Sequence, residues 1–567
     1  MKMSNEKFRV IVLPIVAIIV VLVIVLTMAA NTYSAALDLA FGRGQRHVVD
    51  AGNVSEEAAE YYEALFPNPD AGTLENADPP TEIEEKSRNW AAETALKVTE
   101  EGVTLLKNDG LLPLARNSEV TLFGVRYISP CWGGAGSANM SMNFDYVVTP
   151  EEALDANFAV NAEVEAKMKA ATPLTLNSSE AGFNASSSAQ PSGTSSTHTI
   201  FEYDPSVYDG TEASCKGTVG IVFIGRLGLE GDDQWSKPYD NGEADYAMQL
   251  TQTEREMLAF AKANCDSVVV ICNFSNIVEI AELENDDDIN AILWVGNPGA
   301  KGFQAMTEVL VGDVNPSGRL VNTWIADQTK DPTWPNVSNG TFSNTESGTY
   351  YEYEEGIYVD YRYYETAAAE AAAGNYAGFD YDEQVVYPFG YGLHYENDKV
   401  SQELDEVRFA GRNLIVSGRI VNNSSRMVKE VVQLYLEAPY YPNGSKIEKS
   451  AKSLIGFDKI AVEAGESEEF SLTIPAEDFA NYDDAGYYIP SGGYVLEEGE
   501  YVVHLGKNAH EDWTSGTFTV DETLAYTEGS TRHDATAIGK RPSDGIEAVN
   551  QFDEVNRYIS EGNAHVS

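Results

Sequence analysis

The longest hydrophobic run of the chain lies at its amino terminus, over residues 10–30, and contains no charged residue. Three basic residues precede it: Lys2, Lys7 and Arg9. As a helix, about 21 residues extend roughly 31 Å, which is enough to cross a bilayer. We therefore predict a transmembrane anchor over 10–30, with the basic flank 1–9 in the cytoplasm and the bulk of the chain outside the cell.

Two other interpretations of this run stay open. A cleavable signal peptide usually has a shorter apolar region, of about 7–15 residues, but small residues near the end of the run would permit cleavage. These small residues are Ala29, Ala30, Ala35 and Ala36. A buried helix of a soluble domain is the weaker alternative, because the uncharged run is long and stands at the start of the chain. We expect the polar, acidic residues 31–83 to form a juxtamembrane stalk.

From residue 84 onward, short apolar runs alternate with amphipathic segments. The continuous apolar runs predict buried strands over 120–124, 217–225, 266–273 and 289–296. Helical spacing predicts helices over 85–103, 253–263 and 302–312. This alternation indicates a mostly parallel sheet that is covered on both faces. Ligands of such sheets bind outside the carboxyl ends of the strands.

Two of the predicted helices carry more specific expectations. In the helix over 85–103 we expect core contacts from four residues: Trp90, Ala91, Ala95 and Val98. Gly102 is expected to stop or kink this helix. In the helix over 253–263, Thr253 and Glu256 have the spacing of an amino-terminal capping box.

The pattern changes from about residue 402 to short strands separated by turns that contain Gly, Asn or Pro. The strand segments are LIVSGRIVNN, KEVVQLYLEAP, EFSLTIPAEDF and EYVVHLG. Helical spacing is nearly absent, so we predict an antiparallel β-sandwich of immunoglobulin-like type. Residues 173–200 are rich in Ser, Thr, Asn and Gly and predict an exposed excursion. The expected fold class is therefore α/β plus all-β, preceded by a transmembrane helix and followed by a polar tail.

Composition excludes some functions. Acidic residues outnumber basic ones by 89 to 37, which gives a formal net charge of −52. Such a charge repels nucleic acid, so we expect no nucleic-acid partner. It suits a surface that handles neutral substrates such as sugars, although an acidic proteome or a salty medium explains it equally well.

The chain contains four cysteines: Cys131, Cys215, Cys265 and Cys272. None belongs to a CxxC pair, so a zinc or redox site of that type is not expected. We interpret them as buried free thiols, with one disulfide bridge as the alternative if the chain lies outside the cell.

Nine segments stand in a distinctive order along the chain. The first six are VTLLKNDGLLPL (103–114), FGVRYISPCWGGAGSANM (123–140), GRLGLEGDD (225–233), ILWVGNPGAKGFQAMTEVLVGDVNPSGRLVNTW (292–324), YYEYEEGIYVDYRYYE (350–365) and VVYPFGYGLHY (385–395). The last three are VVQLYLEAPY (431–440), LIGFDKI (454–460) and VLEEGEYVVHLGKNAHE (495–511). Together they span about residues 84–520, and in content and order they resemble glycoside hydrolase family 3.

This resemblance implies a domain plan. It assigns residues 84–398 to the family's α/β-sandwich domain and 399–522 to its fibronectin type III-like domain. Members usually also carry a TIM barrel of roughly 250–300 residues, which supplies a nucleophilic aspartate in a Ser-Asp-Trp segment and most sugar contacts. The Asp512–Trp513 pair lies in the predicted β-sandwich and is not interpreted as that nucleophile. We expect the barrel to be missing from this chain, with 523–567 as a tail or linker toward it.

The resemblance also implies that Glu230 is the catalytic acid/base. A retaining glycosidase uses two carboxyl groups about 5–5.5 Å apart, one as nucleophile and one as acid/base. In the family, the acid/base is the Glu of a Gly-Glu-Gly-x-Asp-like segment just after a sheet strand, and here that segment is 229–233. Leu229 replaces the usual small residue, and Gln234 stands where Arg is common, which could alter how the loop is held. Without the resemblance, a solvated acidic turn would be the simpler interpretation.

Other candidate positions receive structural interpretations. We interpret Glu354, Glu355 and Asp360 as packing and surface residues. The loop Gly133–Ser137 lacks a Walker ending and a dinucleotide fingerprint, so we interpret it as a close-approach loop beside the active site, with an ordinary turn as the alternative. No metal-binding or nucleophile-elbow motif is found in the sequence, so we expect no metal and no cofactor. Substrate-binding residues are not identified by the sequence.

These expectations combine into one function and one alternative. The first is a retaining, exo-acting β-glucosidase-like hydrolase that acts on β-linked oligosaccharides or glycosides. In it, Glu230 supplies the acid/base half of the site, a missing or separate TIM barrel supplies the nucleophile, and the chain alone is expected to be inactive. The alternative is a non-catalytic, membrane-anchored surface protein that binds glycans or a partner. The coding sequence downstream distinguishes them, since an open frame for a barrel with Ser-Asp-Trp favours the hydrolase.

Overall fold

The computed structural model describes residues 82–133, 147–176, 200–228, 238–239, 241–334, 355–439 and 445–527. The chain divides into two units between Arg88 and Asn89, and each is considered by itself. Of the first unit, only the start of helix α5 (Glu82–Gly102) is described. The predicted anchor 10–30 lies outside the described residues, as do nearly all of the predicted stalk 31–83 and residues 528–567 of the predicted tail 523–567. None of the described helices combines the length and the hydrophobicity of a membrane span.

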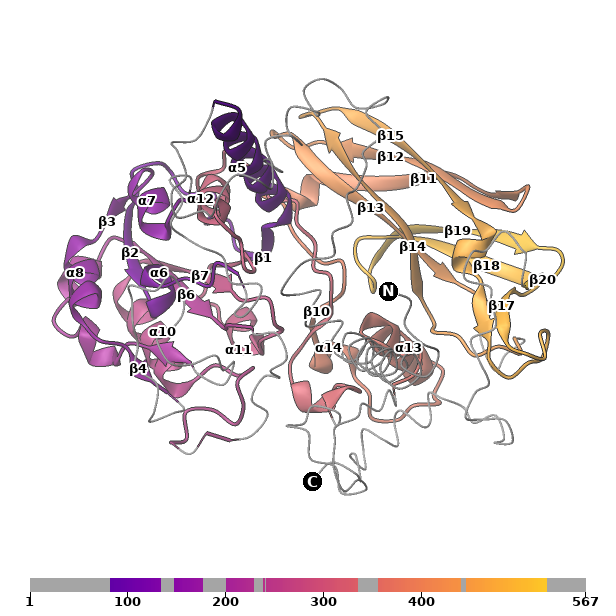
Figure 1. The fold of residues 1–567 in the computed structure, drawn as a ribbon, viewed down its shortest axis with the longest axis horizontal. Coiled ribbons are helices and arrows are strands. Elements are labelled where there is room, and N and C mark those ends of the chain that lie inside the picture. The colour runs from indigo at the N-terminus through magenta and orange to yellow at the C-terminus, as the bar shows by residue number, and fades with distance from the viewer. Residues whose placement is uncertain are drawn as a thin grey trace, which may run out of the picture. The chain divides into compact units, whose positions relative to one another are not determined.

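A six-stranded sheet forms the centre of the α/β domain, in the order β1-β8-β7-β6-β2-β3 (Figure 1). Its strands are β1 (Thr104–Asn108), β2 (Glu119–Phe123), β3 (Ala159–Val160), β6 (Val219–Gly225), β7 (Ser267–Asn273) and β8 (Ala291–Trp294). β1 runs antiparallel to β8, and the other neighbours are parallel. The predicted mostly parallel sheet is confirmed, and the four predicted strands correspond to β2, β6, β7 and β8.

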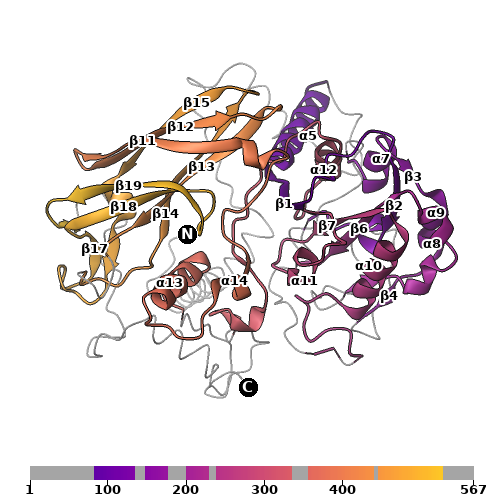
Figure 2. The same ribbon diagram turned by 180° about the vertical axis from the view of Figure 1, so that it is seen from behind.

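Helices cover both faces of this sheet, as its apolar strands require. They are α5, α6 (Val125–Ile128), α7 (Pro150–Asp155), α8 (Ala162–Ala170), α9 (Glu212–Cys215), α10 (Gln252–Asn264), α11 (Ala281–Glu284) and α12 (Gly302–Val311). α7 packs on α12, whereas α8 and α10 contact strands β2 and β6, and Figures 1 and 2 show the two groups on opposite sides of the sheet. All but the first residue of β6 and of β7 is buried, which explains their continuous apolar sequence.

Helix α5 departs from the prediction. It ends at Gly102 as expected, but Trp90 is 53% exposed and Val98 66%, and among the side chains described in this helix Ala92 is the buried one. Ala91 is exposed and Ala95 only partly buried. The predicted core contacts of Trp90, Ala91 and Val98 were therefore wrong, because these side chains are exposed. The last turn of the helix makes polar contacts. Glu101 accepts hydrogen bonds from Lys429 and Lys459.

Helix α10 (Gln252–Asn264) begins one residue before the predicted start at 253. Thr251 is its amino-terminal cap and forms a capping box with Glu254, so the predicted pair of Thr253 and Glu256 was wrong. Thr253 is engaged elsewhere, since both its backbone N–H and its hydroxyl donate to the carboxylate of Glu243.

Short elements complete the α/β part and lead into the second domain. They are β4 (Leu174–Thr175), β5 (Phe201–Glu202), β9 (Trp324–Ile325), α13 (Tyr361–Ala372), α14 (Tyr381–Gln384) and β10 (Val385–Tyr387), with 3₁₀ helices at Pro205–Tyr208, Gln328–Lys330 and Asn397–Lys399. β9 pairs with β10, and β4 with β5. Aromatic residues of the Tyr-rich segment form a separate cluster around Tyr358, Tyr363 and Tyr364.

The carboxy-terminal domain is the predicted antiparallel β-sandwich. One sheet contains β11 (Val400–Ala410), β12 (Asn413–Asn422) and β15 (Ser467–Pro475). The other contains β14 (Ser453–Val462), β13 (Val428–Glu437), β18 (Gly499–Gly506) and β19 (Asp512–Val520). A small third sheet has β16 (Asn481–Asp483), β17 (Gly493–Leu496) and β20 (Leu524–Tyr526), after a 3₁₀ helix at Ala476–Phe479. Buried residues alternate along β12, as expected for a strand with one face on a core.

Motifs that carry the family resemblance join the two domains. Arg319 of the NPSGRL segment and His394 of the PFGYGLHY segment both contact the buried Glu430 of β13, the Arg319 Nη2–Glu430 Oε2 distance being 3.1 Å. Gln402 donates to the other oxygen of Glu430 at 2.8 Å. Burial on its own would raise the pKa of Glu430, but Arg319 and His394 hold it below its ordinary value. These residues therefore form a buried network of charged side chains that links the α/β domain to the β-sandwich.

Candidate active site

The predicted acid/base, Glu230, lies in residues 229–237, outside the described residues. Its loop leaves the carboxyl end of β6 at Gly225, which is the edge where ligands of an α/β sheet bind. The described chain continues to Gly228 and resumes with residues 238–239 and 241 onward. The structure thus describes the residues that flank this segment in the chain, and these residues form a hydrogen-bonded frame.

Arg226 forms the base of the frame, and all five of its N–H donors are used. Nε donates to Ala247 O at 2.7 Å, Nη1 to Gly225 O at 3.0 Å and Nη2 to Gln249 O at 2.7 Å. Nη1 and Nη2 also donate to the two carboxylate oxygens of Glu254, at 2.7 and 2.9 Å. A single guanidinium therefore ties the end of β6 to residues 247–249, which close the loop, and to the first turn of α10.

Glu254 completes this frame from the helix side. Its carboxylate accepts from the backbone N–H of Thr251 at 2.8 Å as well as from Arg226. Burial on its own would raise the pKa of Glu254, but Arg226 outweighs it and holds the pKa below its ordinary value. Arg226 thus favours the charged form of Glu254, and the opposite charges of the two side chains compensate each other.

Asn273, the last residue of β7, fastens the neighbouring loop to the same edge. Its amide accepts from Cys131 N–H at 2.7 Å and donates to Cys131 O at 2.9 Å and to Gly296 O at 2.8 Å. Gly225 allows this close packing, since a Cβ there would lie 2.8 Å from Asn273 O and 2.8 Å from Arg126 Cγ. The predicted close-approach loop begins two residues after Cys131. Only Gly133 of that loop is described, and Gly134–Ser137 lie outside the described residues.

The other sequence candidates have structural surroundings. Glu354 lies outside the described residues, and Glu355 is buried. Asp360 accepts a hydrogen bond from Thr323 N–H at 2.7 Å, and burial raises its pKa. Asp512 is paired with Lys452 at 3.1 Å and with His504 at 2.7 Å. Its carboxylate therefore takes part in an ion-pair network within the β-sandwich.

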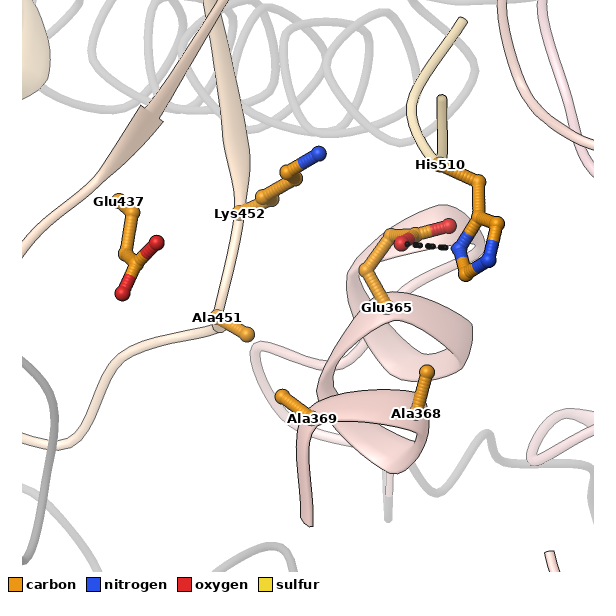
Figure 3. A pocket seen from close by; sticks show the side chains of 7 residues that line it. All are labelled: Glu365, Ala368, Ala369, Glu437, Ala451, Lys452 and His510. Atoms are coloured by element: carbon orange, nitrogen blue, oxygen red, sulfur yellow. Dashed lines mark hydrogen bonds and ion pairs between the residues drawn. The ribbon is translucent and has the colours of Figure 1, made fainter. Parts of the chain in front are cut away.

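A separate cavity of about 560 Å³ lies between α13 and the β-sandwich (Figure 3). Its lining residues are Glu365, Ala368, Ala369, Glu437, Ala451, Lys452 and His510. Figure 3 shows Glu365 and His510 pointing toward each other, 3.0 Å apart, with Glu437 across the cavity. Tyr381 donates to the other oxygen of Glu365 and stacks on His510. The charged lining residues all have partners, so this network ties α13 to the sandwich.

Sequence reasoning missed both the Arg226–Glu254 frame and this second network. A signal existed for the first, because Arg226 directly follows an apolar strand and a buried arginine needs a carboxylate partner. For the second no signal was available, since Glu365 and His510 are 145 residues apart in sequence. Within the described part of the chain, no three His, Cys, Asp or Glu side chains are placed to hold a metal ion. All four thiols are free, with Cys265 partly buried and the other three buried.

Comparisons with known proteins agree with the described domains. The model of the "Glycosyl hydrolase family 3 C-terminal domain" matches residues 103–361, and that of the "Fibronectin type III-like domain" matches residues 430–509. Among curated relatives, a β-glucosidase of Ruminococcus albus is 28% identical over 77% of this chain and 41% of its own length. β-Glucosidase A of Butyrivibrio fibrisolvens is 28% identical over 81% of this chain and 55% of its own length.

Solved structures show the same similarity. β-Glucosidase 3B of Thermotoga neapolitana superimposes with a TM-score of 0.60 at 28% identity, over 79% of this chain and 56% of its own. A β-glucosidase of Paenibacillus barengoltzii gives 0.61 at 27% identity, over 76% of this chain and 44% of its own. The chain spans about half the length of these relatives. The two domain matches, in this order and supported by these relatives, show that residues 103–361 form the C-terminal domain of glycoside hydrolase family 3 and that residues 430–509 form a fibronectin type III-like domain.

Proposed function

We propose that this chain supplies the acid/base half of a retaining, exo-acting β-glucosidase-like hydrolase, with Glu230 as the acid/base. The observation that carries the proposal is the frame at the end of β6, where Arg226 binds both the strand end and Ala247 O. The loop between these points contains Glu230 and starts at the ligand-binding edge of the sheet. The matched relatives are β-glucosidases, which supports a β-linked glucoside as the substrate class.

The chemistry explains why a fixed loop base matters. The acid/base first gives its proton to the departing glycosidic oxygen, and then takes a proton from the water that attacks the glycosyl-enzyme intermediate. Both steps need the carboxyl group within hydrogen-bond reach of the reacting oxygen. A loop whose two ends are bonded to one guanidinium loses less entropy when the carboxyl is positioned. The nucleophile is proposed to come from a TIM barrel that is covalently linked to this chain or separate from it.

We further propose that residues 10–30 anchor the chain in the cell membrane with the described domains outside. Alkaline carbonate extraction of cells tests the anchor, and protease treatment of intact cells tests the orientation. The proposal expects the chain to stay with the membrane and its carboxy-terminal domains to be digested from outside. Release by carbonate, or full protection from protease in intact cells, would contradict it.

The activity test compares two purified chains. One is the present chain, and the other continues into any barrel that is encoded after Ser567. Only the longer chain, or the present chain mixed with a separate barrel, is expected to hydrolyse aryl β-glucosides. In that active form, Glu230→Gln is expected to lower kcat/KM strongly for a poor phenol leaving group and weakly for 2,4-dinitrophenol, which needs no proton. Equal losses for both leaving groups would contradict the acid/base role.

A further inference from the structure

Two of the four cysteines lie beside each other at the end of the sheet opposite the predicted active site. Cys215 is the last residue of α9, and Cys265 is the carboxy-terminal cap of α10. The two thiols are neighbours, since each contributes to the pKa of the other. The Thr218 hydroxyl touches both residues, with Oγ1 2.7 Å from Cys215 O and 3.7 Å from Cys265 Sγ.

The backbone holds the two segments together without help from the thiols. Asp266 N–H donates to Thr218 O at 2.9 Å, and Gly217 N–H donates to Asp266 Oδ1 at 3.1 Å. Gly220 leaves room for the Cys265 side chain, since a Cβ at Gly220 would lie 3.1 Å from Cys265 Sγ. The backbone at the start of β6 and β7 therefore fixes the positions of the two cysteines.

The pair also differs from the other two cysteines in access. Cys265 is partly buried, whereas Cys215 is fully buried. Cys131 and Cys272 are both fully buried. Among the described residues, no other thiol contributes to the pKa of either one. Cys131 and Cys272 thus provide an internal control.

We propose that Cys215 and Cys265 are an oxidation site that closes to a disulfide when the folded chain meets a disulfide oxidant such as oxidised glutathione. The Cys265 thiolate attacks one glutathione sulfur, which breaks the S–S bond and releases one reduced glutathione. The Cys215 thiolate then attacks the Cys265 sulfur and releases the second. The two cysteine protons end on the two glutathiones, so one disulfide is lost for each one formed.

The surroundings set the speed of this reaction. Burial raises the pKa of Cys265 to about 12, so its reactive thiolate is scarce at neutral pH. Closure is therefore slow near pH 7 and faster by roughly tenfold per pH unit up to about pH 9. Once formed, the bridge closes a loop that contains β6 and α10, and it restricts the unfolded chain. The inference rests on the thiols alone and not on the proposed function.

The test incubates the folded chain with oxidised and reduced glutathione at pH 8.5, then unfolds it and alkylates the free thiols. The expected product carries two alkyl groups, has lost about 2 Da, and yields a peptide that links Cys215 to Cys265. Its melting temperature rises by several degrees and returns on reduction. Cys215→Ser should leave glutathione attached to Cys265, whereas Cys272→Ser should close like the parent chain.

Three outcomes would overturn the proposal. One is a chain that alkylates at all four cysteines after incubation. Another is a parent chain in which Cys265 keeps its glutathione, because the Cys215 sulfur then cannot reach the Cys265 sulfur to form the disulfide. The third is a linked peptide that contains Cys131 or Cys272. The same incubation in 8 M urea, where pairing is expected to scramble, shows whether the folded structure selects the pair.

Discussion

The guanidinium of Arg226 and the carboxylate of Glu254 meet through two parallel hydrogen bonds of 2.7 and 2.9 Å, with both side chains 2% exposed. Glu254 at the same time forms the capping box of helix α10 with Thr251. This pair therefore joins a strand end, a loop end and a helix start, all at the edge of the sheet from which the predicted acid/base loop leaves.

Breaking this pair is expected to be costly. Arg226→Met leaves the Glu254 carboxylate buried without its cation, and we expect a loss of about 3–5 kcal/mol in the free energy of unfolding. Arg226→Lys should lose less, because the charge stays but an ammonium cannot make the same fork of contacts. Urea unfolding measures both.

The adjacent Arg255 provides the matched control. It pairs with Glu282 at 2.8 Å, but these side chains are 38% and 44% exposed. Arg255→Met should therefore cost less than about 1 kcal/mol. Equal losses for Arg226→Met and Arg255→Met would mean that the buried frame has no special role.

Replacing the side-chain amide of Asn273 by a carboxylate should destabilise the fold. In Asn273→Asp, an acceptor oxygen replaces the Nδ2 group that donates to Cys131 O and Gly296 O. We expect a loss of about 2–4 kcal/mol by urea unfolding, because buried carbonyls are left unpaired and face a carboxylate. Asn264→Asp is the control, since the Asn264 amide is only partly buried and donates to one carbonyl. A loss no larger than that of the control would contradict the account of Asn273.

Gly318 of the NPSGRL segment is expected to accept no side chain. A Cβ at this position would lie 2.5 Å from Gly102 O and 2.5 Å from Thr104 Oγ1. Gly318→Ala should therefore lower the melting temperature by the equivalent of about 1–3 kcal/mol. Nothing lies within 4 Å of a Cβ at Gly102, so Gly102→Ala should change stability by less than about 1 kcal/mol. If the two substitutions changed stability equally, the claim that Gly318 is needed for close backbone packing would be contradicted.

Stability should depend on pH through His504. Its ring nitrogens lie 2.7 Å from Asp512 and 3.2 Å from Glu437, and Lys452 is 3.1 Å from Asp512. Burial on its own would lower the pKa of His504, and Lys452 also opposes its protonation, but the two carboxylates outweigh them and raise the pKa. The protonated ring therefore stabilises the fold below its unfolded pKa of about 6.5, and this contribution is lost as pH rises through the folded pKa.

Melting temperatures of the parent chain and His504→Gln between pH 5 and 9 test this. The substitution should cost most at pH 5 to 6, and the difference between the two chains should shrink as pH rises. His510 also titrates, but it is present in both chains and cancels. A difference that is constant with pH, or that grows toward pH 9, would contradict the sign of the pKa shift.

The strands of the sheet could be predicted from the sequence, because a strand that is buried on both faces consists almost entirely of apolar residues. β6 and β7 are uninterrupted apolar runs, and no long-range information was needed to recognise them. The capping pair of α10 was predicted wrongly, because Thr251 with Glu254 has the same spacing as the predicted pair of Thr253 with Glu256. Arg226 decides between them by binding Glu254, and this partner is 28 residues away.

Other features depend on tertiary contacts that local periodicity does not report. Spacing in α5 indicated a helix but not the face that meets the core, so Trp90 was placed inside although it is 53% exposed. In the network of Arg319, His394 and Glu430, residues of two family-like motifs contact the β-sandwich. The sequence of those motifs did not indicate that Glu430 would be their partner. For Glu230, the family resemblance remains the source of the prediction.

The central claim is that Glu230 is the acid/base of a retaining β-glucosidase, and azide rescue tests it most directly. In the active, barrel-containing form, Glu230→Ala should be slow on 2,4-dinitrophenyl β-glucoside, and added azide should restore turnover. Without the carboxylate at 230, azide attacks the glycosyl-enzyme from the face where water normally enters, so the product should be β-glucosyl azide. No rescue, or α-glucosyl azide as the product, would contradict the account.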